Sequence, residues 1–256
     1  MPGVLACGAS KDVAVALVQA LALRVVAGRL EHDEAGREYL GISFDRMERD
    51  GRHEVRRMTP PTLGPKFEEA LLLAVRVQGG QLRKGAAEIP YVSHLLSVCA
   101  LVLEDGGDED EAIAALLHDT LEDRPEEVTR SGLVRRFGTR VADLVAACTD
   151  TPPDYRGGPK APWPGRKAAY VERIREEPYP LCRVALADKL HNTRCVVLDH
   201  RRFGDKIWKE FKESKADQIR HHRALVDAFR AAKAPEYLVD ELDSLVKELE
   251  ASEVGA

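Results

Sequence analysis

The stretch PYVSHLLSVCALVLEDGGDEDEAIAALLHDTLED, residues 90–123, decides the fold. Two apolar runs of helical length, 90–103 and 112–121, flank an acidic connection that contains two glycines. Proline in the first turn of the earlier run is already in a helical conformation. The stretch therefore predicts two neighbouring helices of a helical core.

The same periodicity extends to both sides of this stretch. In residues 67–78, FEEALLLAVRVQ, apolar side chains recur at spacings of three and four, as one face of a helix requires. No paired runs with the alternating pattern of a hairpin follow. The fold class is predicted as all-α, a bundle of roughly eight to ten helices. The predicted helices cover residues 67–78, 90–103, 111–123, 126–137, 139–149, 165–177, 180–200, 206–231 and 236–250.

The acidic run EDGGDEDE, residues 104–111, allows two interpretations. It leads into the second helix, whose N-terminus favours negative charge. We therefore interpret the run as helix capping rather than as a metal site. The Pro- and Gly-rich segment 151–165 is predicted to be a loop, long enough to have a function of its own.

Composition restricts the possible functions. The chain has 256 residues, 44% of them hydrophobic and 32% charged, and its net charge is −5. These values exclude a disordered chain and provide no broad basic surface for DNA, RNA or an anionic membrane. An anionic substrate would need a local cationic patch. The five cysteines form no C-x-x-C pair, which argues against a zinc knuckle, a redox motif or a disulfide framework.

The first 57 residues differ from the rest. They contain nine basic and nine acidic residues and no sustained period after one apolar stretch. That stretch, 12–28, includes Asp12, Gln19 and Arg24 and is too short to span a bilayer. We predict a cytoplasmic protein with an extension of unknown role at 1–57 and a compact domain at 58–256. Met58, before Thr59-Pro60-Pro61, is a candidate natural start.

Chemistry is expected where polar residues interrupt apolar helices. His118 and Asp119 follow AIAALL, and Glu122 and Asp123 lie three to four residues further on. On a continuous helix one turn would present all four groups together. Such groups repel and desolvate each other unless a cation neutralises them.

Two further helices have the same kind of interruption. His94 lies within PYVSHLLSVCALVL, and Asp188 lies within VALADKL, one turn before Asn192. Two imidazoles and two carboxylates form a nitrogen and oxygen donor set that suits a divalent ion such as Mn²⁺ or Fe²⁺. The absence of a cysteine ligand argues against structural zinc.

The order H…HD…D resembles the HD-domain metal phosphohydrolase superfamily. A longer series of motifs resembles the hydrolase half of RelA/SpoT proteins, and most of all the small alarmone hydrolases. The series comprises GQLRK (80–84), IPYVSH (89–94), ALLHDTLED (115–123), FG (137–138), TD (149–150) and LADKLHN (186–192). The Glu-Asp pair of HDxxED distinguishes this group from other HD hydrolases.

The resemblance implies a role for each matching position. The ligands of one divalent metal ion, Mn²⁺ above all, would be His94, His118, Asp119 and Asp188. Glu122 and Asp123 would orient and deprotonate the attacking water. The substrate would be bound by Arg83, Lys84 and Asn192. The reaction implied is hydrolysis of the 3′-pyrophosphate of (p)ppGpp.

Further cations could reach the substrate phosphates. We predict that Lys167 does so, and Arg166, Lys160 and Lys215 are weaker candidates. His221 and His222 are interpreted as ordinary surface or packing residues. One departure from the related proteins is Gln78, which stands where many of them have histidine.

Two other functions fit the same residues. The metal site could act on another nucleotide, such as NADPH at its 2′-phosphate. Alternatively, the protein could bind the alarmone without catalysis, in the manner of an antitoxin, although the intact HDxxED block argues against this. The partner predicted is a small-molecule nucleotide, with no DNA, RNA or membrane, and the oligomeric state is left open.

Overall fold

The computed structural model describes residues 61–84, 88–151, 155, 157–177, 179 and 181–254. Within these ranges all the regular elements are helices, apart from an isolated bridge between Leu82 and Pro90. The predicted all-α class is confirmed. The predicted extension at 1–57 lies outside the described residues, so the boundary at residue 58 stays a prediction. The elements are α2 (Pro65–Gln78), α3 (Val92–Glu104), α4 (Glu109–Leu117), α5 (Thr120–Asp123), α6 (Arg130–Phe137), α7 (Thr139–Cys148), α8 (Trp163–Glu176), α9 (Arg183–Phe203), the 3-10 helix η3 (Gly204–Glu210), α10 (Lys215–Ala231) and α11 (Glu236–Val254).

Helix α4 lies at the centre of the bundle. Each of residues 112–117 is 0% exposed, because α2, α3, α7 and α9 pack around the helix. A helix that is apolar on every side must be surrounded in this way. The His118-Asp119 pair therefore emerges directly from the hydrophobic core.

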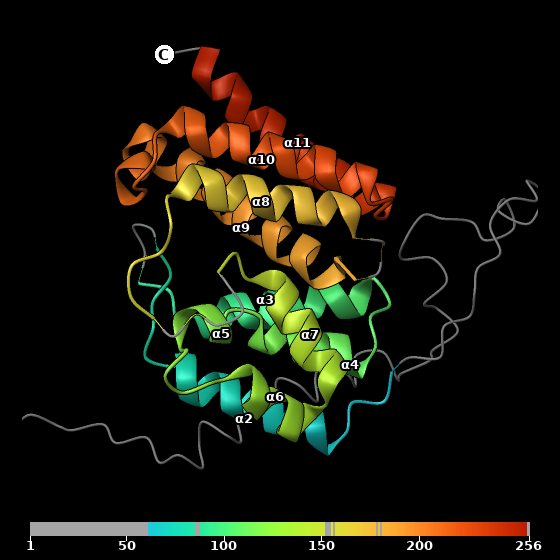
Figure 1. Ribbon diagram of the computed structural model, residues 1–256. Coiled ribbons are helices and arrows are strands. Elements are labelled where there is room, and N and C mark those ends of the chain that lie inside the picture. The colour runs from blue at the N-terminus through green and yellow to red at the C-terminus, as the bar shows by residue number, and fades with distance from the viewer. Residues whose placement is uncertain are drawn as a thin grey trace, which may run out of the picture. The chain divides into compact units, whose positions relative to one another are not determined.

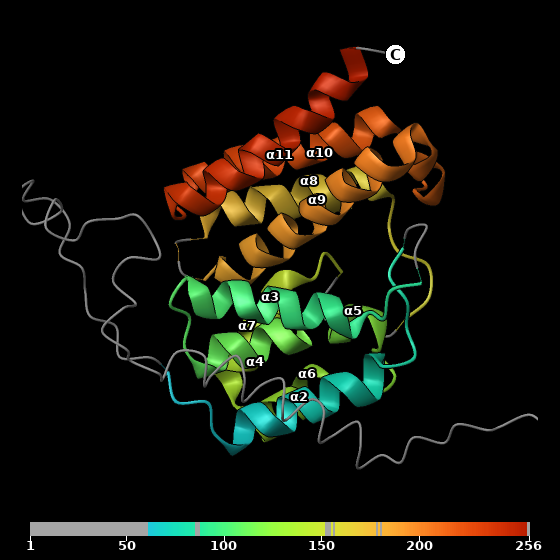
Figure 2. The same cartoon turned by 180° about the vertical axis from the view of Figure 1, so that it is seen from behind.

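Helix α9 joins the inner part of the bundle to an outer layer (Figures 1 and 2). It packs on α3, α4 and α7 on one side and on α10 and α11 on the other. Helix α8 packs against α10. The side chains of α9 therefore contact the inner helices on one side of α9 and the outer helices α10 and α11 on the other. Among the described residues, none of the helices has both the length and the apolar character needed to cross a bilayer.

The predicted single helix over 111–123 is wrong. Helix α4 ends at Leu117, and α5 begins at Thr120 with Asp119 at its N-cap. The Thr120 hydroxyl donates a hydrogen bond of 2.7 Å to the Leu117 carbonyl, so a side chain satisfies the end of α4. His118 and Asp119 both keep right-handed helical dihedral angles, so the break is an interruption of the helical hydrogen bonds.

The predicted helix over 206–231 is also wrong. The chain forms η3, leaves helical geometry at Phe211, and starts α10 after Ser214, whose hydroxyl accepts from the backbone N–H of Asp217. Ile207 and Trp208 of η3 belong to a small apolar cluster of their own. Ser214 provides the N-cap at which a new helix can start, so the break lies between the buried pair and this cap.

The acidic run is used for capping, as interpreted. The Asp108 carboxylate accepts from the backbone N–H of Glu111 at 3.1 Å, and the Glu111 carboxylate accepts from the backbone N–H of Asp108 at 2.9 Å. This is a reciprocal capping box. Arg140 from α7 also donates to Asp108. The negative charge therefore stabilises the start of the central helix.

Candidate metal centre and substrate cavity

Four side chains from three parts of the fold converge beside the end of α4. His94 comes from α3, His118 and Asp119 from the α4–α5 break, and Asp188 from α9. His94 Nε2 lies 3.1 Å from Asp188 Oδ1 and 3.8 Å from Asp119 Oδ2. His118 Nε2 lies 2.9 Å from Asp119 Oδ2 and 3.5 Å from Asp188 Oδ1. The structure thus brings together all four predicted metal ligands.

Both imidazoles are oriented by a contact at Nδ1, on the side of the ring away from the carboxylates. His118 Nδ1 lies 2.8 Å from the Ala115 carbonyl oxygen and must carry a proton to bond with it. Its Nε2 is buried and makes no hydrogen bond of acceptable geometry to the described residues, although Asp119 Oδ2 lies 2.9 Å away. His94 Nδ1 lies 2.8 Å from His191 Nδ1, which leaves His94 Nε2 facing the carboxylates. A buried, unpartnered nitrogen beside two carboxylate oxygens fits a bound cation.

The carboxylates of Asp119 and Asp188 are also held by hydrogen bonds. Asp188 Oδ2 accepts from Lys189 Nζ at 2.6 Å, and Asp188 Oδ1 accepts from Asn192 Nδ2 at 2.5 Å. The Tyr91 hydroxyl donates to Asp119 Oδ2. These contacts leave little rotational freedom to either carboxylate. Asn192, predicted for the substrate, therefore also positions a predicted ligand.

The electrostatics of the cluster favour a positive charge. Burial alone would lower the pKa of His118, but Asp119 and Asp188 raise it well above its ordinary value, so a proton on this imidazole supplies the positive charge that a bound cation would otherwise supply. Burial would raise the pKa of Asp188, but Lys189 and the two imidazoles hold it well below its usual range. The carboxylates are thus ionised and attract a cation, while burial lowers the pKa of His94 and keeps it neutral. A neutral imidazole is the form that binds metals.

The two predicted catalytic carboxylates diverge from the metal ligands. Glu122 accepts from the Thr149 hydroxyl at 3.1 Å and pairs with Lys160. Asp123 accepts from Gln81 Nε2 at 3.2 Å. The pKa of Asp123 is raised, first by burial and then by the charge of Asp119. A raised carboxylate pKa makes Asp123 a stronger base near neutral pH.

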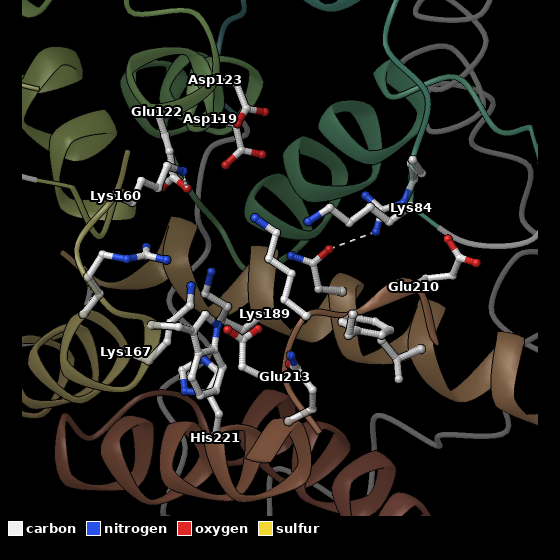
Figure 3. Close-up of a pocket in the computed structure, with 18 of the residues that line it drawn as sticks. Lys84, Asp119, Glu122, Asp123, Lys160, Lys167, Lys189, Glu210, Glu213 and His221 are labelled. Carbon is white, nitrogen blue, oxygen red and sulfur yellow. Dashed lines mark hydrogen bonds and ion pairs between the residues drawn. The ribbon is translucent and has the colours of Figure 1, made fainter. Parts of the chain in front are cut away.

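These groups border a cavity of about 960 Å³ (Figure 3). Asp119, Glu122 and Asp123 lie on one side of it, and Lys160, Lys167 and Lys189 extend into it from the loop before α8, from α8 and from α9. The lysines provide the local positive patch that a net-negative protein needs for an anionic substrate.

The predicted substrate-binding residues all line this cavity, but they differ in how firmly neighbouring side chains hold them. They are Arg83, Lys84, Lys167 and Asn192. Arg83 Nη2 donates to Asn192 Oδ1 at 2.9 Å. Lys84 is exposed at the edge of the cavity. Lys167 Nζ lies 2.8 Å from Asp150 Oδ2, so it must share its charge between that carboxylate and a ligand.

The weaker candidates separate into two groups. Lys160 and Arg166 line the cavity. Lys215 does not, because its ammonium binds Asp205 and the backbone carbonyl of Ser252.

Sequence reasoning missed several cavity residues. Lys189 follows Asp188 on an otherwise apolar helix, a signal that was present but unused. His221 lines the cavity and contacts the Trp163 ring edge-on, contrary to an ordinary surface position. Burial, His222 and the nearby lysines lower the pKa of His221 to about 2, so this imidazole is neutral. His222 is buried and packs through a 2.9 Å contact with Thr193 Oγ1.

Comparison with known proteins places this geometry in a family. The family model described as "HD domain" matches residues 70–215. The chain belongs to the HD-domain family. The HD-domain fold implies a divalent metal ion, and His94, His118 and Asp119 offer ligand atoms that all lie within 4.8 Å of one another.

Two curated relatives of this HD-domain chain differ in how much of their own length the chain covers. It is 32% identical over 146 residues to the "GTP pyrophosphokinase rsh" of Brucella ovis, which covers 55% of the chain but 18% of that protein. The chain thus spans less than a fifth of such long relatives. It is 34% identical over 144 residues to the guanosine-3′,5′-bis(diphosphate) 3′-pyrophosphohydrolase of Xenopus tropicalis, covering 56% of the chain and 73% of that protein.

Two solved structures share the fold of this HD-domain chain. A structure described as a metazoan ortholog of SpoT that hydrolyzes ppGpp superposes with a TM-score of 0.60 at 26% identity, over 72% of this chain and 96% of that one. A Listeria monocytogenes structure superposes with a TM-score of 0.52 at 28% identity, over 60% of this chain and 96% of that one. The helical arrangement around the site is therefore that of the family.

Proposed function

We propose that this HD-domain protein hydrolyses the 3′-pyrophosphate of (p)ppGpp, releasing GDP or GTP and pyrophosphate, with Mn²⁺ as its metal ion. The observation that carries the proposal is one arrangement. The buried set of two imidazoles and two carboxylates borders a cavity that also contains the Glu122-Asp123 pair and several lysines. The names of the Xenopus relative and of the metazoan structure support the choice of substrate.

The proposed ligands of the Mn²⁺ ion are His94, His118, Asp119 and Asp188. A mixed nitrogen and oxygen set suits this metal, and the unpartnered Nε2 of His118 is the atom that most needs such a ligand. When bound, the ion would lower the pKa of a water molecule and offset charge on the phosphorus.

The chain's own residues would supply the remaining chemistry. Asp123, with its raised pKa, would accept a proton from the attacking water. Glu122, fixed by Thr149 and Lys160, would orient that water. The phosphates would be neutralised by Lys167, Arg83 and Lys84. Without these cations, the carboxylates that line the cavity would repel the phosphates. Asn192 would hold Arg83 in place for this contact.

We propose the same organisation for the whole chain as the sequence suggests. Residues 58–256 would form the hydrolase domain, and 1–57 would be an extension outside it. The cytoplasmic location and the absence of a nucleic-acid partner stay predictions.

The proposal is tested by an assay of purified protein with Mn²⁺ against ppGpp, pppGpp, NADPH and deoxynucleoside triphosphates. We expect pyrophosphate and GDP from ppGpp. Phosphate release from NADPH without pyrophosphate from ppGpp would favour the alternative HD-type phosphatase. Tight ppGpp binding without any turnover would favour the non-catalytic protein.

A further inference from the structure

A second cluster of buried charges lies at a distance from the metal centre, along the same three helices. Asp105 follows the last residue of α3, Glu111 lies in the first turn of α4, and Arg183 begins α9. Their side chains are 5%, 3% and 12% exposed, respectively. The chemistry proposed above uses none of these three residues.

Arg183 bridges the two carboxylates. Its Nε donates to Asp105 Oδ2 at 2.7 Å, and its Nη1 donates to Glu111 Oε1 at 2.6 Å and to Glu111 Oε2 at 2.7 Å. One guanidinium of α9 therefore holds the end of α3 and the start of α4 at once. The planar guanidinium donates in several fixed directions, whereas a lysine ammonium acts as a point charge.

Two tyrosines donate to the same Asp105 carboxylate. Tyr179, between α8 and α9, donates to Oδ2, and its hydroxyl also accepts from Arg183 Nε at 3.0 Å. Tyr237, in the first turn of α11, donates to Oδ1. The start of α11 and the α3–α4 connection lie on one side of the bundle, and α5 lies toward the other side (Figures 1 and 2). Asp105 and Arg183 are thus the centre of a fixed polar cluster.

The three helices that Arg183 joins are those that carry proposed metal ligands. The bridged carboxylate of α3 lies 11 residues beyond His94, and that of α4 lies seven residues before His118. On α9, Arg183 lies five residues before Asp188. At 1.5 Å per residue these separations correspond to about 17, 11 and 8 Å along the helix axes. A shift of α9 at the bridge is therefore a shift of Asp188 at the metal centre.

Apolar packing and ion pairs constrain the position of α9 differently. The hydrophobic effect is non-directional, so it depends only weakly on a small sliding of α9 along α3 and α4. A charge-assisted hydrogen bond depends on both distance and direction. The net stability gained from a buried ion pair is small, because desolvation offsets the attraction. The bridge is therefore better suited to fix one axial position of α9 than to stabilise the fold.

We propose that Arg183 is a positioning residue of the metal centre. By binding Asp105 and Glu111 it sets the axial position of α9, and with it the distance from Asp188 to the two imidazoles. Arg183 does not line the cavity, so it acts through α9 rather than on a ligand. The inference rests on the proposed function for the identity of the metal ligands, and it adds a residue that holds them in place from a distance.

The test is the affinity of the full-length protein for Mn²⁺, measured by calorimetry well below Tm, where every variant is folded. Arg183→Gln removes the charged contacts with both carboxylates. We expect its Kd for Mn²⁺ to rise about tenfold, the lower end of the effect of losing an outer-shell partner. Arg183→Lys keeps the charge but cannot hold both carboxylates in the same directions, and its Kd should rise about threefold. Thermal melting verifies folding, and Arg183→Lys serves alone if Arg183→Gln does not fold.

Tyr237→Phe is the matched control. It removes a hydrogen bond to the same Asp105, but from α11, which carries none of the proposed ligands. It should leave the Kd for Mn²⁺ unchanged, whatever its effect on Tm. A merely structural role for Arg183 would lower Tm in its variants without changing the metal affinity of the folded protein.

The outcomes separate the positioning role from the activity. An unchanged Kd in both Arg183 variants overturns the positioning role, as does an equal loss of affinity in Tyr237→Phe, while ppGpp turnover can still stand. Metal affinity that depends on Arg183, without pyrophosphate release from ppGpp, supports the positioning role and removes the proposed activity. An unmodified protein that binds no Mn²⁺ overturns the metal centre and the positioning role together.

Discussion

At the scale of single residues, Asp188 is in contact with four neighbouring side chains. Its two oxygens face both histidines, Lys189 and Asn192 within one buried cluster. Asp188→Asn keeps the size and some of the hydrogen bonds but removes the negative charge. Loss of an outer-shell partner typically costs 10–100-fold in metal affinity, so loss of a ligand should cost about 100-fold or more. Metal content after dialysis, measured by mass spectrometry, should fall far below that of Asp143→Asn, a surface control on α7. Retention of Mn²⁺ and activity in Asp188→Asn would contradict the ligand role.

Glu122 provides the complementary residue-scale prediction. It contacts Thr149 and Lys160 rather than the histidines, so Glu122→Gln should keep the metal and lose the chemistry. We expect kcat to fall by about 10² to 10⁴, the usual contribution of a positioned acid or base. The measurement is turnover together with metal content in the same preparation. Loss of Mn²⁺ from this variant would assign Glu122 to the ligand set instead.

At the scale of elements, the start of α4 determines where His118 and Asp119 lie. Asp108→Ala removes one half of the capping box and the partner of Arg140. Loss of an N-cap costs about 1 kcal/mol, which lowers Tm by about 2 to 4 °C for a domain of this size. Calorimetry of Asp108→Ala against Glu126→Ala, an exposed carboxylate outside the helices, measures this effect. An unchanged Tm would show that the capping box does not contribute to stability.

At the scale of the whole molecule, metal binding joins three separate elements. The proposed ligands come from α3, the α4–α5 break and α9, so the site exists only in the folded chain. A ligand that binds only the folded state stabilises it by about 2.7 kcal/mol at 100 times its Kd. Mn²⁺ should therefore raise Tm by several degrees, and EDTA should reverse the shift. The Asp188→Asn variant should show no such response, and an equal response there would place the bound ion elsewhere.

The acid side of the stability curve depends in part on His222. Burial and the nearby lysines lower its pKa to about 4, below the ordinary value of 6.5. The unfolded chain therefore binds a proton that the folded chain does not, and stability is lost as the pH falls from about 6.5 toward 4. His222→Asn can still donate to Thr193 but cannot take up this proton. Between pH 7.5 and 5 its free energy of unfolding should fall by about 1 to 2 kcal/mol less than that of the unmodified protein. Identical pH profiles in chemical denaturation would contradict this account.

Much of the fold was predictable because it depends on local pattern. The apolar period placed the central helices, and the acidic run was interpreted as a cap because a helix N-terminus favours carboxylates wherever it lies. The breaks at His118 and at Phe211 were not predictable, because both depend on what packs around them. Thr120 satisfies the end of α4 through its side chain, and Ile207 and Trp208 are buried in a cluster that includes residues distant in the sequence.

The candidate site, like the fold, has features that the sequence predicted and features that only the structure showed. The residue types and their order, from His94 to Asn192, are a property of the sequence by itself, and they were enough to indicate an all-α HD hydrolase with a metal site. Only the tertiary structure decided that Lys189 orients Asp188, that Lys167 is shared with Asp150, and that His221 lines the cavity beside Trp163. The physical reason is that ligand chemistry depends on residue identity, whereas the partners of a side chain depend on which helices the hydrophobic core brings side by side.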